Sequence, residues 1–202
     1  MRTFLGRVRR LAALDTSVFA EVRDQPGETA PALLVVIGAT FLAALGGWIW
    51  LEIDIAGLDT GKIVIKELLL GSIFSLLMWG VWVLVTQTVL ATLFHVPTPP
   101  LALVRTMGYA AVPLALTVAM LIPTVSFGIG VVALVIWFAL TGTAIQAAAP
   151  RASGGQVLIA NLAGFTCYAI LLAILADAAG LAPGLFVHGA DLAEYFDFGA
   201  LG

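Results

Sequence analysis

Charged residues are scarce in this sequence. Asp, Glu, Lys and Arg make up 10% of its 202 residues, whereas 61% of the residues are hydrophobic. Soluble domains carry about 25% charged residues, so a surface that faces water all round cannot be built from this composition. The shortage of charge excludes a soluble globular protein and favours a membrane protein whose main partner is the lipid bilayer. The formal net charge of −3 also argues against nucleic acid as a partner.

Residues that commonly hold metals or form disulfides are equally few. Cys167 is the only cysteine and lies within an apolar run, which excludes an intrachain disulfide and favours a packing role. His95 and His188 fall on opposite sides of the membrane in the topology below, so they cannot share a metal ion. Residues 58–61 match the tetrapeptide of an aspartic protease, but that chemistry needs a second Asp on a β scaffold. We therefore predict no catalytic, cofactor-binding or metal-binding residue and no enzymatic activity.

Long apolar runs separated by charged, Pro-rich or Gly-rich breaks dominate the rest of the chain. A run of about 20 apolar residues is long enough to cross a hydrocarbon core about 30 Å thick as a helix. The pattern predicts an all-α bundle of five transmembrane helices within a domain over residues 31–180. The expected spans are about 31–51, 67–94, 101–122, 127–148 and 156–176.

The basic residues predict the orientation of this bundle. With the N-terminus in the cytoplasm, seven of the nine Lys and Arg residues lie inside, and only Lys62 and Lys66 lie outside. Because Lys and Arg in short loops are retained on the cytoplasmic side, we expect the N-terminus inside and the C-terminus outside. The composition, rich in Arg, Ala and Gly, is typical of bacteria, so the expected location is the bacterial cytoplasmic (inner) membrane.

Residues 1–30 carry a helical pattern rather than that of a disordered leader. Apolar residues from Phe4 to Val22 recur at helical spacing while arginines fill other positions. Asp15, followed by Thr16 and Ser17, is placed to cap a second short helix. We therefore expect two short amphipathic helices that lie on the cytoplasmic leaflet, with a docking surface for a soluble partner as the alternative.

Residues 181–202 form an acidic, aromatic tail on the outer side. It carries acids such as Asp191 and aromatic residues such as Phe198, but no Lys or Arg. Aromatic rings can anchor at headgroup depth, whereas the acids would be repelled by anionic lipid. The tail is therefore expected either to lie on the outer interface or to bind a partner.

Polar residues inside the predicted spans are neutral, which argues against proton-coupled or ion-coupled transport. Gln87 and Asn161 lie in mid-span, where hydrogen bonds between helices are expected to be their main role. Small residues at four-residue spacing, such as Ala39 with Ala43 and Ala160 with Gly164, predict close helix contacts.

The third span carries the least usual local sequence, Gly108-Tyr109-Ala110-Ala111-Val112-Pro113. Pro113 lacks the amide that would bond the Tyr109 carbonyl, so we expect a kink and an exposed acceptor there. In lipid that acceptor must find a neighbour. The kink is read either as a packed structural feature or as a hinge or binding spot.

Several short motifs resemble the YIP domain family, named for Ypt/Rab-interacting proteins. They are Leu14-Asp15-Thr16-Ser17-Val18-Phe19, then Pro26 ahead of the first span, and Gly108-Tyr109 with Pro113 in the third span. The resemblance covers nearly the whole chain in span number and order. It implies five spans, a cytosolic N-terminus and, from the eukaryotic members, a small GTPase as partner. We do not expect the long N-terminal cytosolic extension common in those members.

The sequence therefore suggests two alternative functions. The first is a non-enzymatic scaffold or adaptor that binds other membrane proteins, associates with itself or organises lipid through the N-terminal helices and the third span. The alternative is a permease or transport accessory subunit with a path between helices or protomers. Transport would be favoured if Gln87, Tyr109 and Asn161 faced one water-filled cavity. The scaffold would be favoured if each of them lay in a separate helix contact.

Overall fold

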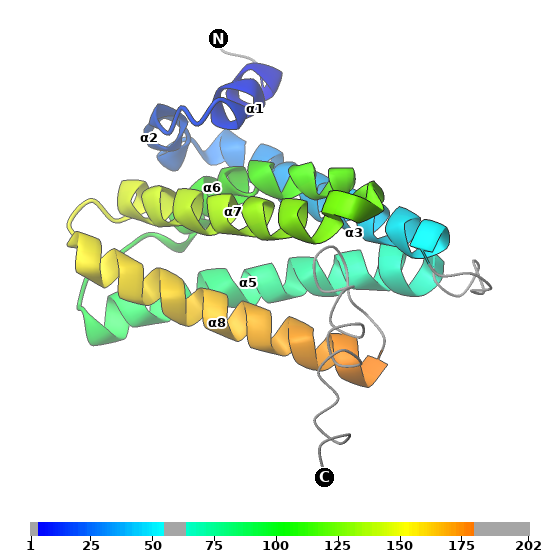
Figure 1. Ribbon diagram of the computed structural model, residues 1–202. Coiled ribbons are helices and arrows are strands. Elements are labelled where there is room, and N and C mark those ends of the chain that lie inside the picture. Colours follow the sequence, from blue (N-terminus) through cyan, green and yellow to red (C-terminus); the bar gives the residue numbers. More distant parts are fainter. Residues whose placement is uncertain (1–3, 55–63, 180–202) are drawn as a thin grey trace.

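The computed structural model describes residues 4–54 and 64–179, and all regular secondary structure in these two ranges is helical (Figure 1). The acidic tail over 181–202, His188, Lys62 and the 58–61 tetrapeptide lie outside the described residues. The α-helices are α1 (Phe4–Ala12), α2 (Ser17–Arg23), α3 (Thr29–Asp54), α5 (Ser72–Thr88), α6 (Pro100–Ala110), α7 (Ser126–Ala148) and α8 (Gly154–Ala179). Tighter or wider helical turns form η1 (Pro26–Glu28), η2 (Val64–Gly71), η3 (Val89–Leu93), η4 (Val112–Leu121) and η5 (Pro123–Val125).

Five of the helical segments are long and apolar enough to cross a membrane. They cover Pro26–Ile49, Leu68–Leu93, Pro100–Met120, Ser126–Ala148 and Gly154–Leu175. The predicted all-α bundle of five spans is confirmed, and the chain is a multi-pass membrane protein. The second span is not one uniform α-helix, because π-helical turns flank α5 at both ends.

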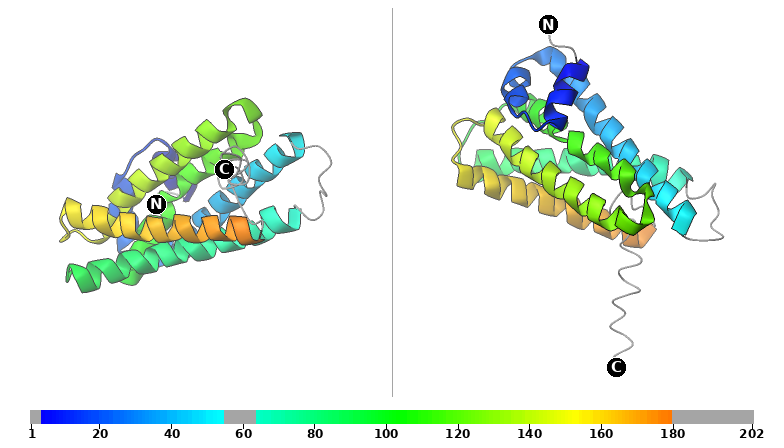
Figure 2. Two further views of the ribbon diagram at one scale, coloured as in Figure 1. Left: turned by 60° about the horizontal axis from the view of Figure 1, so that its bottom comes forward. Right: turned by 45° about the horizontal axis from the view of Figure 1, so that its top comes forward.

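The spans form two layers. Helices α3, α6 with η4, and α7 make one layer, while α5 and α8 pack side by side in the other (Figures 1 and 2). Successive spans run in opposite directions, so the η3–α6 and α7–α8 connections lie at the same end of the bundle as the start of α3. This end is called the N-terminal end below.

Two glycines allow the closest helix contacts. A Cβ on Gly46 of α3 would lie 2.2 Å from the Thr117 carbonyl oxygen of η4, and a Cβ on Gly164 of α8 would lie 2.2 Å from Cδ1 of Trp82. Neither position has room for a side chain. The small-residue face predicted around Ala160 and Gly164 is thus an internal contact between α8 and α5.

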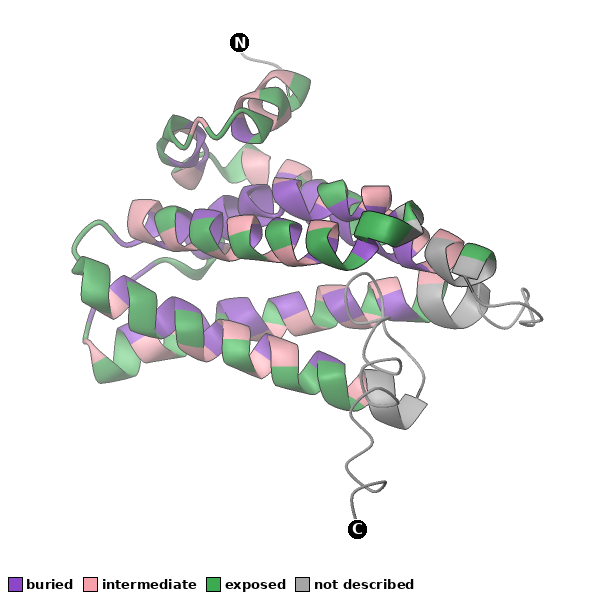
Figure 3. Ribbon diagram, viewed as in Figure 1, coloured by how far each residue is buried: buried purple, intermediate pink, exposed green. Residues whose placement is uncertain are grey.

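The outward faces of the spans are apolar. Leu77 and Leu84 of α5 and Val135 of α7 are 54%, 63% and 60% exposed. Exposed and buried positions alternate along each span, with the buried side turned toward the other helices (Figure 3). Such exposure would be costly in water but suits the hydrocarbon core of a membrane.

Candidate functional site

The residues before the first span form a folded unit that packs on the bundle. We call Phe4–Glu28, which comprises α1, α2 and η1, the N-terminal cap. It lies over α6 and α7 toward the N-terminal end (Figures 1 and 2). Leu11, Val18 and Val22, which helped to define the predicted lipid-facing side, are buried inside the protein instead. Phe19 is also buried, at 1% exposure.

Asp15 holds the turn between the two cap helices. Its Oδ1 accepts hydrogen bonds from the backbone N–H of Ser17 at 3.1 Å and from the Ser17 hydroxyl at 2.6 Å. Nε of Arg10 donates to the other carboxylate oxygen at 2.7 Å. The hydrogen bond from Ser17, followed by the one from Arg10, lowers the pKa of Asp15 to about 2. Leu14, in the same turn, has a positive φ of 61°. The two predicted cap helices are thus present, and Asp15 satisfies the first amide of the second one.

Tyr109 connects the cap to the third span. It is fully buried, and its hydroxyl donates to Oε2 of Glu28 over 2.7 Å. Arg7 of α1 donates to the other oxygen of Glu28 at 2.5 Å, and the Phe4 ring lies 6.4 Å from the Tyr109 ring. We call Arg7, Glu28 and Tyr109 the clamp, because it joins α1, η1 and α6 in one polar contact.

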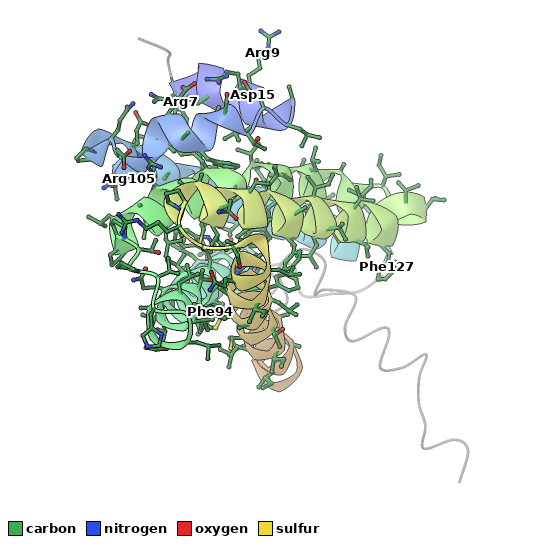
Figure 4. All side chains as sticks on the ribbon, turned by 90° about the vertical axis from the view of Figure 1, so that its left-hand side faces the viewer. Arg7, Arg9, Asp15, Phe94, Arg105 and Phe127 are labelled. Atoms are coloured by element: carbon green, nitrogen blue, oxygen red, sulfur yellow. The ribbon has the colours of Figure 1, made fainter. Side chains whose placement is uncertain are left out.

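Gly108 and Arg105 extend this contact along α6. A Cβ on Gly108 would lie 3.0 Å from the Ala32 side chain and backbone, so this glycine lets α3 approach α6 closely. Arg105 is only 7% exposed; its Nε donates to the Thr29 hydroxyl at 3.0 Å, and Nη1 donates to the Arg23 carbonyl. From its place near the start of the third span, Arg105 would be expected to reach the membrane interface, but its side chain is buried instead. Arg105 lies beneath the junction of α2 and α3, and Figure 4 shows it below the cap.

The two motif prolines mark changes of helix type. Pro26 is the first residue of η1 and is exposed, and Pro113 is buried near the start of η4, where the third span changes from an α-helix to a 3₁₀-helix. The predicted break in the helix is present. The expected exposed acceptor is wrong, because the backbone N–H of Ala111, just after α6, bonds the carbonyls of Gly108 and Tyr109.

Phe19, Gly108 and Tyr109 are therefore buried where the cap meets the bundle. Asp15 has its hydrogen bonds within the cap, and Pro26 is exposed. Pro113 follows the end of α6, the helix that carries Gly108 and Tyr109. Sequence reasoning missed Arg7, Glu28 and Arg105. Glu28 and Arg105 had one available signal, a charge inside a span, where an unpaired charge is costly, whereas Arg7 lies outside the spans and had none.

The mid-span polar residues lie elsewhere, in separate contacts. Nε2 of Gln87 donates to the Thr98 carbonyl at 2.9 Å, and Nδ2 of Asn161 donates to the Phe138 carbonyl at 3.1 Å. Neither residue, nor Tyr109, lines the apolar groove of about 610 Å³ between η4 and α7 or the smaller cavity of about 240 Å³ at the N-terminal end. Gln87, Tyr109 and Asn161 thus share neither of these two cavities.

An aromatic cluster between the two layers was also missed. Trp82 of α5 contacts Trp137 of α7 at 5.0 Å between ring centroids, and Phe165 and Tyr168 of α8 lie 5.2 and 5.6 Å from Trp82. The Tyr168 hydroxyl is 3.2 Å from the Ser75 hydroxyl. The sequence shows these aromatic residues but not that they meet, because they come from three different spans.

Within the described ranges, no group of three or more His, Cys, Asp or Glu side chains is placed to hold a metal ion. Comparison of the chain with protein-family models, with curated proteins and with solved structures finds no match. The resemblance to the YIP domain family stays a prediction.

Proposed function

We propose that this protein is a non-enzymatic scaffold or adaptor of the bacterial inner membrane, and that the N-terminal cap carries its binding surface for another membrane protein or a second copy. The observation that carries the proposal is the clamp. It fixes the cap on the third span, so the outer side of the cap is a surface of defined shape. A preformed surface binds with a smaller entropic cost than a flexible segment does.

The outer side of the cap combines apolar and basic groups. Leu5 and Leu14 are 74% and 58% exposed. Arg9 is exposed, makes no ion pair within the described residues and points away from the bundle (Figure 4). Arginine is one of the residues enriched in protein interfaces.

The placement of the mid-span polar residues supports an adaptor over a permease. Gln87, Tyr109 and Asn161 each donate a hydrogen bond to a different partner, and none of them lines either of the two cavities. A transport path, in contrast, requires polar groups around a shared water-filled space. The orientation expected from the Lys and Arg residues puts the cap in the cytoplasm. The resemblance to the YIP domain family suggests a more specific cytoplasmic partner, a small GTPase.

The test uses a photo-crosslinking amino acid placed singly at Leu5, Arg9 and Leu14 of the cap, in cells that express the full chain. Leu84 and Val135, on the lipid-facing sides of α5 and α7, are the control positions. We expect one protein to be captured from all three cap positions and from neither control position. Introducing Arg9→Glu should abolish capture from Leu5 and Leu14.

Adducts that contain only lipid at the cap, or the same proteins at the cap and at the control positions, would contradict the proposal. Uptake or efflux of a solute by purified protein in vesicles, unaffected by Arg9→Glu, would favour the permease. If the captured protein is a small GTPase, capture should depend on the bound nucleotide.

A further inference from the structure

The smaller cavity lies at the N-terminal end of the bundle, outside the clamp. It has a volume of about 240 Å³ and is lined by the end of α2, the η3–α6 connection and the α7–α8 connection. Its lining residues include Arg23, Asp24, Val96, Pro99, Ala148 and Arg151. Three segments far apart in the sequence therefore build one pocket.

This pocket has an excess of positive charge. Arg23 forms an ion pair with Asp24 at 2.6 Å and donates to the Ala147 carbonyl at 3.3 Å. The hydrogen bond from Arg23, followed by the charges of Arg23 and Arg105, lowers the pKa of Asp24. Arg105 also donates to the Arg23 carbonyl. Arg151 makes no hydrogen bond or ion pair within the described part of the chain. Two guanidinium groups, those of Arg23 and Arg151, thus line the pocket with one carboxylate, and Arg151 has no partner within the described residues.

The pocket also lies where the headgroups of a bilayer are expected. The third and fifth spans begin at Pro100 and Gly154, and the fourth ends at Ala148, all next to the pocket. Apart from the two arginines and Asp24, the residues that line it are apolar: Val96, Pro97, Pro99, Ala102, Ala148, Ala149 and Pro150. A ligand that is anionic at one end and apolar at the other matches this lining.

We propose that this pocket binds the phosphate group of an anionic phospholipid. Arg151 and Arg23 contact the phosphate oxygens, because guanidinium groups match phosphate geometry and remain charged. The apolar walls contact the glycerol and the first carbons of the acyl chains. Basic pockets between transmembrane helices are a known type of site for such headgroups. Asp24 competes with the phosphate for Arg23 and so limits the affinity.

The test compares binding of phosphatidylglycerol and phosphatidylcholine to the detergent-purified, delipidated full chain by native mass spectrometry. The variants are Arg151→Gln, Asp24→Asn and, as the matched loss of one charge outside the pocket, Arg9→Gln. A thermal melt of each variant checks that it is folded. A parallel titration with inorganic phosphate separates a soluble phosphate from a lipid headgroup.

We expect the wild type to prefer phosphatidylglycerol. Arg151→Gln should weaken its binding about five-fold, the effect of one charge at an anionic surface. Arg9→Gln should leave it within about two-fold, and Asp24→Asn should strengthen it, because the competing carboxylate is gone. Millimolar inorganic phosphate should not displace the lipid.

Equal losses in Arg151→Gln and Arg9→Gln would overturn the proposal in favour of diffuse attraction between charges. Weaker or unchanged binding in folded Asp24→Asn would also overturn it, since the predicted competition would be absent. Binding of inorganic phosphate that depends on Arg151, with no preference between the two lipids, would assign the pocket to a soluble phosphate instead. The proposal does not rest on the adaptor function, because none of these measurements involves a protein partner.

Discussion

At the scale of single residues, Tyr109 has the contact whose loss is easiest to isolate. Tyr109→Phe removes only the hydroxyl that donates to Glu28, and the carboxylate keeps its ion pair with Arg7. A hydrogen bond to a charged group contributes about 1.5–3 kcal/mol, so we expect a loss of about 2 kcal/mol of stability. Thermal unfolding in mild detergent, followed by tryptophan fluorescence, measures this change.

Tyr168→Phe provides a control of the same chemistry. Its hydroxyl is also buried, but it is paired with the neutral Ser75 hydroxyl at 3.2 Å, where the expected cost is about 0.5–1.5 kcal/mol. A smaller loss for Tyr109→Phe than for Tyr168→Phe would show that the clamp does not hold the cap.

The sequence singled out Tyr109 but not its partners, for a physical reason. Tyr109 stands next to a glycine and near a proline, which is a local feature. Glu28 lies 81 residues earlier, and nothing in the local pattern of either residue encodes that pairing. Arg105 was misread for a related reason, since a charge near a span end can either reach the interface or be buried with partners. Only the position of α2 and the start of α3 decides between the two.

At the scale of elements, the contact between α5 and α8 depends on Gly164. A Cβ there would lie 2.2 Å from Cδ1 of Trp82, 2.8 Å from the Trp82 carbonyl oxygen and 2.9 Å from the Thr86 hydroxyl. The indole and the backbone cannot move aside without shifting the helices. We therefore expect Gly164→Ala to destabilise the protein by about 1–3 kcal/mol.

Gly80→Ala in α5 is the matched control, because a Cβ at that position meets nothing within 4 Å. Its melting temperature should stay at or above that of the wild type, since alanine favours the helix more than glycine does. Thermal unfolding followed by tryptophan fluorescence compares the melting temperatures of the two variants. Equal behaviour of Gly164→Ala and Gly80→Ala would mean that the two helices do not pack as described.

The positions of the spans could be predicted from the sequence, whereas the pairs of spans that pack against each other could not. Apolar length alone identifies a span, because the thickness of the hydrocarbon core sets it. The spans are apolar on nearly all sides, so the buried face does not stand out from the lipid-facing one. Small residues such as Gly164 revealed a contact face but not that α5 would occupy it. The π-helical turns around α5 and the 3₁₀-helix after Pro113 depend on packing between spans, which propensities do not encode.

At the scale of the whole molecule, the arginines of the described chain gather toward one end. Arg105 bonds the Arg23 carbonyl of the cap, and Arg151 lies in the α7–α8 connection beside Arg23, at the N-terminal end of the bundle. Because basic residues are retained on the cytoplasmic side, this arrangement supports the predicted orientation with the cap in the cytoplasm. Both the adaptor proposal and the lipid proposal concern that side of the membrane.

Single cysteines labelled with a membrane-impermeant maleimide test the orientation. Cys167→Ala removes the native thiol, and new cysteines replace His95, Gly155 and Thr124, which are all exposed. His95 and Gly155 lie at the N-terminal end, while Thr124 precedes α7 at the opposite end. The 23 residues of α7 span roughly 34 Å, enough to separate the two compartments. In intact spheroplasts we expect only the cysteine at 124 to react, with the other two reacting after permeabilisation. The inverse pattern would contradict the orientation, and reaction of all three from one side would contradict the crossing of the fourth span itself.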